Sequence, residues 1–246
     1  FDKFSDASNK LGTQMKATGE VMSIGRTMEE SLLKAVRSLE TGVCHIYHKK
    51  FDKWSNDDLL AYIKGGTDDR LYAIGQLIRN GVDLALIYDK TKIDMFFLEK
   101  FKNIVEFENV VRAHPMDVET LRAAKRMGFS DKYIGQLWGL SQNEMYRLRE
   151  KNNVFPVYKM IDTCASEFAS YVPYFYSTYE EENESIVSGK EKIIVLGSGP
   201  IRIGQGVEFD YSTVHAIWSI RAAGYEAIII NNNPETVSTD YTTSDK

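Results

Sequence analysis

Three glutamates, Glu20, Glu208 and Glu235, stand where a carboxylate could take part in chemistry. Each follows a glycine or a proline by one or two positions, so the carboxylate lies beside a bend of the backbone. The ordinary role of such an acid is a surface group or an acceptor of structural hydrogen bonds. A buried carboxylate, in contrast, has a raised pKa and can hold or donate a proton. Whether these three glutamates can hold or donate a proton therefore depends on how deeply the surrounding elements bury them.

A glycine-rich turn precedes Glu208. An apolar segment at 193–196 is typical of a strand, and glycines follow at positions 197, 199, 204 and 206. Without Cβ atoms this stretch lets a ligand or another backbone approach closely. The pattern then predicts an amphipathic helix and a second apolar strand at 227–230. The segment therefore predicts the N-terminal half of an α/β domain. The glycine-rich turn is its candidate functional surface.

The turn does not match the common nucleotide-binding loops. A dinucleotide fingerprint needs its third glycine at position 202, which is Arg202, and an acid after the second strand, where residues 231–233 are asparagines. A P-loop needs Gly-Lys followed by Ser or Thr, and the sequence contains no such run. The absence of both patterns therefore argues against a nucleotide site in this turn.

Cys44, His45 and His48 have the right chemistry for a metal site. Three ligands within five residues, with no fourth nearby in the sequence, are poor geometry for zinc, and we expect these side chains to pack instead. His215 comes one helical turn after Tyr211 and is expected to be structural. No combination of Ser, His and Asp suggests a catalytic triad. The sequence therefore predicts no metal ligands.

The bulk composition indicates a globular chain. Its 246 residues are 43% apolar and 12% aromatic, enough for one large or two ordinary domains. A net charge of −5 argues against a general binder of nucleic acids or anionic membranes. No apolar run approaches the ~20 residues of a membrane span, and no signal peptide opens the chain. With only two cysteines, a cytoplasmic location is expected. Because the chain begins without Met and stops before a parallel sheet is complete, we interpret it as part of a larger polypeptide.

The middle of the chain is predicted to be helical. Helix starts are predicted at Thr27 with Glu30 three residues later, at Asp57 and Asp58, at Thr67, after Thr91, after Asp117, and at Ser141 with Glu144. Glycines at 42, 65–66, 81, 128 and 139 are predicted to end or divide these helices. Residues 157–189 have no clear period. Four tyrosines between 171 and 179 predict a connector docked on a domain surface.

The three short helices predicted within 120–152 resemble a helix-turn-helix, which makes DNA binding an alternative function. From residue 117 to residue 152 the chain carries seven basic and five acidic residues. This small excess of positive charge is too weak for a surface that binds DNA.

Sequence motifs at both ends and in the connector carry a family resemblance. LGSGPIRIGQGVEFDY at 196–211, followed by NNNPETVSTDY at 231–241, resembles the start of the second synthetase half of the carbamoyl phosphate synthetase large subunit. TQMKATGEVMSIGRT at 13–27 resembles the end of the first ATP-grasp domain of that subunit, and residues 157–182 resemble the segment that leads into the second half. Together these motifs cover about half of the chain.

The resemblance implies a central part of that subunit. Its domains would be the tail of the first ATP-grasp domain (1–26), a helical oligomerisation domain (27–156), a connector (157–190) and the start of the second pre-ATP-grasp domain (191–246). The fold class expected is a mainly α-helical middle domain followed by the first βαβ part of an α/β, Rossmann-like pre-ATP-grasp domain.

The resemblance also implies a function. Similar enzymes are ligases that make carbamoyl phosphate from bicarbonate, glutamine-derived ammonia and two ATP, for pyrimidine and arginine synthesis. The catalytic residues, and those that bind ATP, Mg²⁺ and K⁺, are implied to lie in other parts of the parent enzyme, so this chain alone should be inactive. Its expected partners are a glutaminase subunit or domain and further copies of itself, with neither nucleic acid nor membrane.

Four residues match positions in the wall of a buried tunnel that carries carbamate between the two active sites of the family: Glu20, Gly206, Glu208 and Glu235. Protonated glutamates would let neutral carbamic acid pass, whereas ionised ones would repel the anion. A Cβ atom at Gly206 would narrow the bore. These roles are implied by the resemblance.

A second hypothesis is a non-enzymatic helical interaction module. Its partner face would consist of apolar residues of the longest predicted helix, namely Phe96, Phe97, Phe101, Ile104 and Phe107. The competing expectation for the same residues is burial in the core.

Overall fold

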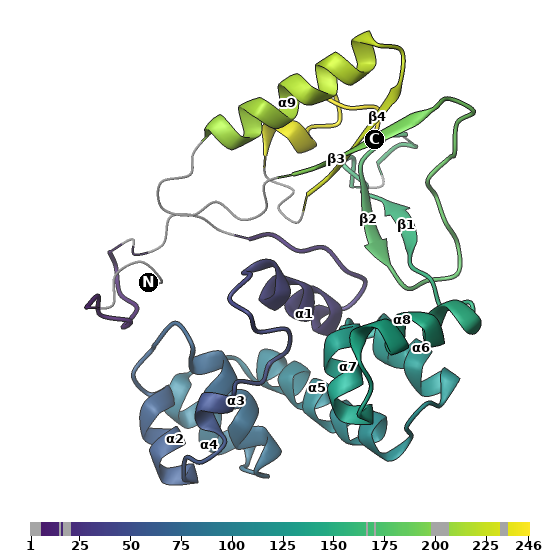
Figure 1. Cartoon of the computed structure of the whole chain (residues 1–246). Coiled ribbons are helices and arrows are strands. Elements are labelled where there is room, and N and C mark those ends of the chain that lie inside the picture. The colour runs from purple at the N-terminus through teal and green to yellow at the C-terminus, as the bar shows by residue number, and fades with distance from the viewer. Residues whose placement is uncertain are drawn as a thin grey trace. The chain divides into compact units, whose positions relative to one another are not determined.

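The chain folds into two compact units (Figure 1). The computed structural model describes residues 6–14, 16, 21–165, 167–169, 171–197, 207–231 and 236–246, with only the backbone at 207–209. The first unit consists of Phe1–Ala17 and Thr27–Val154, and the second of Thr18–Arg26 and Phe155–Lys246.

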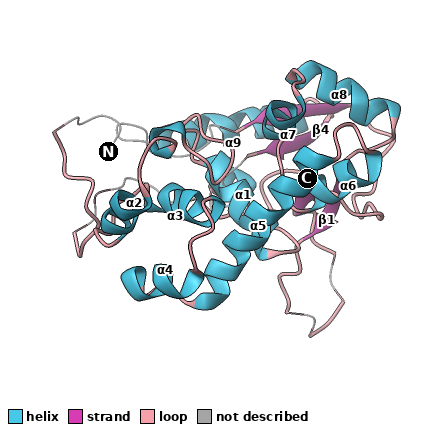
Figure 2. Cartoon of the chain, turned by 90° about the horizontal axis from the view of Figure 1, so that it is seen from below, coloured by secondary structure: helices cyan, strands magenta, loops and turns pink. Residues whose placement is uncertain are grey.

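The first unit is helical. Its helices are α1 Met28–Ser38, α2 Asn56–Ile63, α3 Arg70–Arg79, α4 Leu84–Thr91, α5 Met95–Ala113, α6 Val118–Arg126, α7 Asp131–Trp138 and α8 Gln142–Lys151, with a short 3₁₀ turn at Lys49–Phe51. The central helix α5 contacts α1, α3, α4, α6 and α7. Both views place α2–α4 near one end of α5 and α6–α8 near the other (Figures 1 and 2). Among the described residues, no helix is both long and apolar enough to cross a membrane.

Several predicted helix ends are confirmed. Thr27 accepts a hydrogen bond from the Glu30 amide at 3.2 Å, and Ser141 and Glu144 form a complete capping box. Glycines 81, 128 and 139 follow α3, α6 and α7 with φ angles of 79°, 93° and 71°. In this left-handed region glycine has no steric penalty. Local sequence therefore sets these boundaries.

The predicted boundaries of α1 and α3 are wrong by a few residues. Helix α1 ends at Ser38, ahead of Gly42, because the backbone of Glu40 already enters the left-handed region at φ 52°. Helix α3 begins after Asp69, whereas Thr67 was predicted as its cap. Thr67 instead pairs with Lys10 in an isolated antiparallel bridge. A residue other than the predicted one therefore sets each boundary: Glu40 stops α1, and Asp69 precedes α3.

Helix α4 was not predicted, and the start of α5 was predicted a few residues too early. Asp83 caps α4, and its side chain accepts from the Ala85 amide at 2.9 Å. Thr91 was expected to precede α5, but it is the last residue of α4 and donates its hydroxyl proton to the Ile87 carbonyl at 2.8 Å. Asp94 caps α5. The short helix α4, with its own cap, therefore occupies the stretch between Gly81 and Thr91 in which no element was predicted.

The second unit contains two small sheets and one long helix. Its elements are β1 Val157–Met160, β2 Phe175–Thr178, β3 Lys192–Leu196, α9 Val207–Ala222, β4 Glu226–Ile230 and a 3₁₀ turn, η2, at Val237–Thr239. Strands β3 and β4 are parallel, and α9 packs against both, as predicted for the start of an α/β domain. The antiparallel pair β1–β2 was not predicted, because its four-residue strands lie far apart in the sequence and within a region without periodicity.

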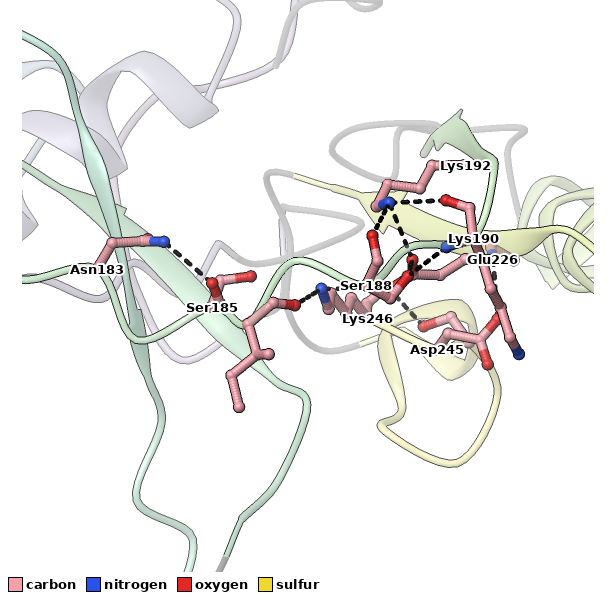
Figure 3. A network of polar contacts seen from close by, with 11 residues as sticks. Asn183, Ser185, Ser188, Lys190, Lys192, Glu226, Asp245 and Lys246 are labelled. Carbon is pink, nitrogen blue, oxygen red and sulfur yellow. Dashed lines mark hydrogen bonds and ion pairs between the residues drawn. The ribbon is translucent and has the colours of Figure 1, made fainter.

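Within the second unit, polar contacts join the end of the connector to β3, β4 and the C-terminal residue (Figure 3). The Ser188 hydroxyl donates to the carboxylate of Glu226, the first residue of β4, and Lys192 donates to the Ser188 and Lys190 carbonyls, each at 2.7 Å. Lys246 donates to the Ile186 carbonyl and lies 3.2 Å from Glu226. The hydrogen bond from Ser188 and the nearby lysines lower the pKa of Glu226. Glu226 is therefore the common partner of these contacts.

Candidate functional site

The carboxyl ends of β3 and β4 lie side by side. Leu196 pairs with Ile230 in the parallel register, and the Gly197 amide donates to the Ile230 carbonyl at 2.7 Å. A Cβ atom on Gly197 would lie only 2.5 Å from Cγ of Asn231. Gly197 is therefore needed for the Asn231 side chain to pack against the start of the glycine-rich turn. This edge of a parallel sheet is where α/β domains commonly place ligands.

The loop that follows β4 is fastened at several points. The Thr239 hydroxyl donates to the Thr236 carbonyl at 2.8 Å and accepts from the Thr236 amide at 3.3 Å. The buried Ser238 amide donates to both carboxylate oxygens of Asp210 in α9, at 3.2 and 3.1 Å. Six residues, Gly197, Asp210, Asn231, Thr236, Ser238 and Thr239, form what we call the carboxyl-edge cluster. It joins both strands, α9 and η2.

Three of the four predicted tunnel residues, Gly206, Glu208 and Glu235, lie within four residues of this cluster in the sequence, whereas Glu20 is far from it. Glu20, Gly206 and Glu235 fall outside the described residues. Glu208 is the second residue of α9, and only its backbone is described. Sequence reasoning missed Asp210, which is one of several acids near the turn. No periodicity or spacing distinguishes it from a solvent-exposed carboxylate.

His45 is a packed residue of the helical unit. Its ring is buried, stacks on the Tyr133 ring at 3.8 Å between centroids, and donates from Nε2 to Oε1 of Glu108 at 3.0 Å. His48 accepts from the Lys50 amide at 3.1 Å. The described residues contain no group of three His, Cys, Asp or Glu side chains that could hold a metal ion. The expected packing role of His45 is therefore confirmed.

A buried charge pair, Arg79 with Glu108, lies beside His45. Arg79 donates to both carboxylate oxygens of Glu108, at 2.9 and 2.5 Å, and to the Ile46 carbonyl at 2.9 Å. Burial lowers the pKa of His45 to about 4, so its ring is neutral near pH 7. Burial alone would raise the pKa of Glu108, but the hydrogen bonds from His45 and Arg79 outweigh it and lower this pKa to about 2. Near pH 7 the arrangement therefore keeps His45 neutral and Glu108 ionised, and its role is structural.

Three of the seven basic residues of α6–α8, Arg122, Lys125 and Arg149, make contacts inside the unit. Lys125 donates to Asp131 and to the Phe129 carbonyl, each at 2.9 Å, and Arg149 contacts the other Asp131 oxygen at 2.8–2.9 Å. Burial lowers the pKa of Lys125 to about 8. Arg122 donates to the Asn152 carbonyl at 2.7 Å. These side chains therefore do not form the basic face that a helix-turn-helix needs to approach DNA.

The apolar residues of α5 that were predicted as a partner face differ in their burial. Phe101 and Ile104 are buried in the core, as the competing expectation had it. Phe96 and Phe97 are 51% and 41% exposed, and their rings contact each other edge to face at 5.3 Å. The exposed pair lies in the first turn of α5.

His215 lies on an exposed face of α9. Its ring lies between the rings of Tyr211 and Trp218, with centroid distances of 4.1 and 5.0 Å. The three residues are spaced at one helical turn, so the contacts form within a single helix. A role for His215 in packing this helix surface agrees with the expectation from sequence.

Two family models match the chain. Residues 20–153 match the carbamoyl-phosphate synthetase large chain, oligomerisation domain, and residues 189–246 match the carbamoyl phosphate synthase preATP-grasp domain. The first match covers more than half of the 246 residues. The chain therefore belongs to the carbamoyl phosphate synthetase large-chain family. The resemblance carried by the sequence motifs is confirmed.

Proposed function

We propose that the chain acts within a glutamine-dependent ligase that makes carbamoyl phosphate from bicarbonate, ammonia and two ATP. The observation that carries this proposal is the presence, in order, of an oligomerisation domain and a preATP-grasp domain of one family. The chain would supply self-association, spacing between synthetase halves and part of a tunnel wall. ATP, Mg²⁺ and K⁺ would be held elsewhere in the complete cytoplasmic enzyme, which a glutaminase subunit or domain would supply with ammonia.

The tunnel role is assigned to Glu20, Gly206, Glu208 and Glu235. A carboxylate in a narrow buried passage is disfavoured in its charged form, so these glutamates would be protonated and would exchange hydrogen bonds with neutral carbamic acid. A described contact links the two segments that carry Glu208 and Glu235. Glu208 lies in the first turn of α9, and Glu235 comes shortly before η2, an element that a hydrogen bond joins to α9.

Replacing Gly206 with leucine in the complete synthetase tests the tunnel. The added side chain would narrow the bore, so carbamate would be lost before the second phosphorylation. We expect ATP consumed per carbamoyl phosphate formed to rise severalfold with ammonia as substrate. Gly189→Leu is the matched control, because a Cβ atom there meets nothing within 4 Å. An unchanged ratio in Gly206→Leu would remove the tunnel role.

Self-association would use the exposed apolar patch on α4 and α5. This patch consists of Leu86, Tyr88, Phe96 and Phe97, all exposed, on two helices that contact each other. Large exposed apolar side chains that gather on one surface are typical of contacts between proteins. Because the matched family domain is described as an oligomerisation domain, the proposed occupant is a second copy of the chain.

Phe97→Asp tests this interface. Placing a charge in the patch should shift the chain toward monomer by at least tenfold in dissociation constant, since it would bury an unpaired carboxylate. Tyr146→Asp is the control, because it adds the same charge to an exposed aromatic position on α8. Light scattering over a concentration series measures both. Equal association of the two variants would contradict an interface at α4 and α5.

A further inference from the structure

Three aromatic rings of the helical unit surround the ammonium group of Lys50. Its Nζ atom lies 5.0 Å from the Phe51 ring centroid, 5.9 Å from that of Trp54 and 5.0 Å from that of Tyr62. The same atom donates to Oδ2 of Asp69 at 2.7 Å and to the Tyr62 hydroxyl at 3.2 Å. A cation is attracted to the face of an aromatic ring within about 6 Å of its centroid. Three rings and one carboxylate therefore converge on a single cation.

The three rings also contact one another. Phe51 and Trp54 meet at an interplanar angle of 77°, and Trp54 and Tyr62 at 79°, with centroids 5.3 and 5.2 Å apart. Phe51 and Tyr62 lie 5.6 Å apart at 55°. Tilted and edge-to-face contacts of this kind are favourable, so the rings support each other without help from Lys50. We call Phe51, Trp54, Tyr62 and Asp69 the ammonium cage.

Packed elements position the ammonium cage. Phe51 is fully buried at the end of the 3₁₀ turn, Tyr62 lies in α2, and Asp69 directly precedes α3. Helix α3 contacts both α2 and the 3₁₀ turn. Asp69 occupies the N-cap position of α3, but its side chain makes no capping hydrogen bond and instead accepts from the Tyr62 hydroxyl at 2.6 Å. The carboxylate is therefore held by the cage and not by the helix that it precedes.

We propose that the ammonium cage is a binding site for an alkylated ammonium group and that Lys50 closes it from within the chain. Aromatic cages recognise quaternary ammonium ligands. A trimethylammonium group has no N–H to hydrate, whereas the ammonium of a lysine is strongly hydrated, so the methylated group loses less on leaving water. Lys50 is a displaceable occupant, because its side chain is 40% exposed and an exposed ion pair contributes little stability.

The cage without Lys50 is complementary to a cation. Burial would raise the pKa of Asp69, but the hydrogen bonds from Lys50 and Tyr62 outweigh burial and lower this pKa. Once Lys50 is removed, the Tyr62 hydroxyl still donates to Asp69, so the carboxylate stays ionised near pH 7. Three ring faces and one negative charge then share a site that lacks its cation. A positively charged ligand is therefore favoured there over a neutral one.

Choline binding to the purified chain tests the proposal, followed by NMR at the Trp54 indole N–H and at constant ionic strength. Lys50→Ala should lower the dissociation constant about tenfold, which corresponds to a cage open about one tenth of the time in the unsubstituted chain. Lys49→Ala is the matched control, because it removes an exposed charge from the same turn. It should leave the dissociation constant unchanged. No gain in Lys50→Ala, or an equal gain in Lys49→Ala, overturns the proposal.

Two comparisons separate recognition of a cation from the filling of an apolar space. The neutral analogue of choline, in which carbon replaces nitrogen, has the same shape without the charge and should bind Lys50→Ala about tenfold more weakly. Adding Tyr62→Leu to Lys50→Ala removes one ring face and the hydroxyl, and should abolish the gain in choline binding. Equal binding of choline and its neutral analogue, or a gain that survives Tyr62→Leu, contradicts the cage.

A peptide that carries trimethyl-lysine distinguishes the two sources of such a ligand. The same peptide with unmodified lysine is its control. Tighter binding of the trimethylated peptide than of choline to Lys50→Ala assigns the cage to a modified protein segment, and the reverse order assigns it to a small molecule. Either order supports the proposal. Failure of both ligands to bind Lys50→Ala overturns it.

Discussion

The helical unit and the α/β unit treat their apolar side chains in opposite ways. The helical unit buries a continuous set of aliphatic residues around α5 and pairs its buried charges, as at Glu108 with Arg79. In the α/β unit, Ile194 and Leu196 of β3 are 54% and 76% exposed. The first unit is therefore stabilised from within. The second presents apolar strand surface that remains available for further contacts.

This difference has an energetic side. A pair of strands with one helix buries little apolar area, and such a sheet is marginally stable by itself. In the helical unit, α5 contacts five other helices. We expect the helical unit to carry most of the chain's stability, and the α/β unit to carry surfaces with a functional role.

The largest expected contrast comes from truncating one leucine in each unit. Leu98 in α5 is fully buried, so Leu98→Ala should lower the free energy of unfolding by about 3 kcal/mol through lost burial and a cavity. Leu196→Ala at the exposed end of β3 should change it by less than about 0.5 kcal/mol. Urea denaturation of both variants measures the contrast. Similar losses of unfolding free energy in the two variants would contradict the difference between the two units.

A slightly smaller effect is expected from the buried charges. Asp131→Ala leaves Lys125 and Arg149 buried without their shared carboxylate, which should cost about 3 kcal/mol or somewhat less, since Asp131 is partly accessible. Asp89→Ala removes an exposed partner of Lys92 and should leave the urea midpoint unchanged. If both variants unfold at the midpoint of the unsubstituted chain, the buried network contributes nothing to stability.

The smallest of these effects depends on pH. An unfolded chain protonates His45 near pH 6.5, whereas the folded chain does so only near the lowered pKa of about 4. Between these values the unfolded state binds more protons, so the free energy of unfolding falls as pH falls. The expected loss is about 2 kcal/mol from pH 6.5 to pH 5. Glu108, with a pKa of about 2, stays ionised in this window.

His45→Gln isolates that pH dependence. Glutamine has no titrating group but can still donate toward Glu108, so the slope between pH 6.5 and 5 should flatten. Urea midpoints measured across this range provide the readout. An unaltered slope in the variant would assign the acid sensitivity to other groups.

Local rules predicted the parts of the fold that depend on neighbouring residues. The Ser141–Glu144 capping box and the β3–α9–β4 order follow from spacing and periodicity, and both were predicted. The strands β1 and β2 were not, because each is short and pairs with a partner across an irregular segment. Neither was α4, whose eight residues offer little periodicity.

Contacts between distant residues account for what the sequence could not supply at the candidate site. His45 meets Glu108 across 63 positions, and Asp210 meets Ser238 across 28. No local pattern marks either pair, since each depends on how whole elements pack. The tunnel residues themselves came from a resemblance in motifs, and their roles stay predictions.

The most direct test of the account compares one substitution from each unit in the complete synthetase. The measurement is ATP consumed per carbamoyl phosphate formed, in Gly206→Leu and in Phe97→Asp. We expect the ratio to rise severalfold in Gly206→Leu and to stay at the unsubstituted value in Phe97→Asp, because only the α/β unit would border the passage. An unchanged ratio in Gly206→Leu, or an equal rise in both variants, would contradict the account.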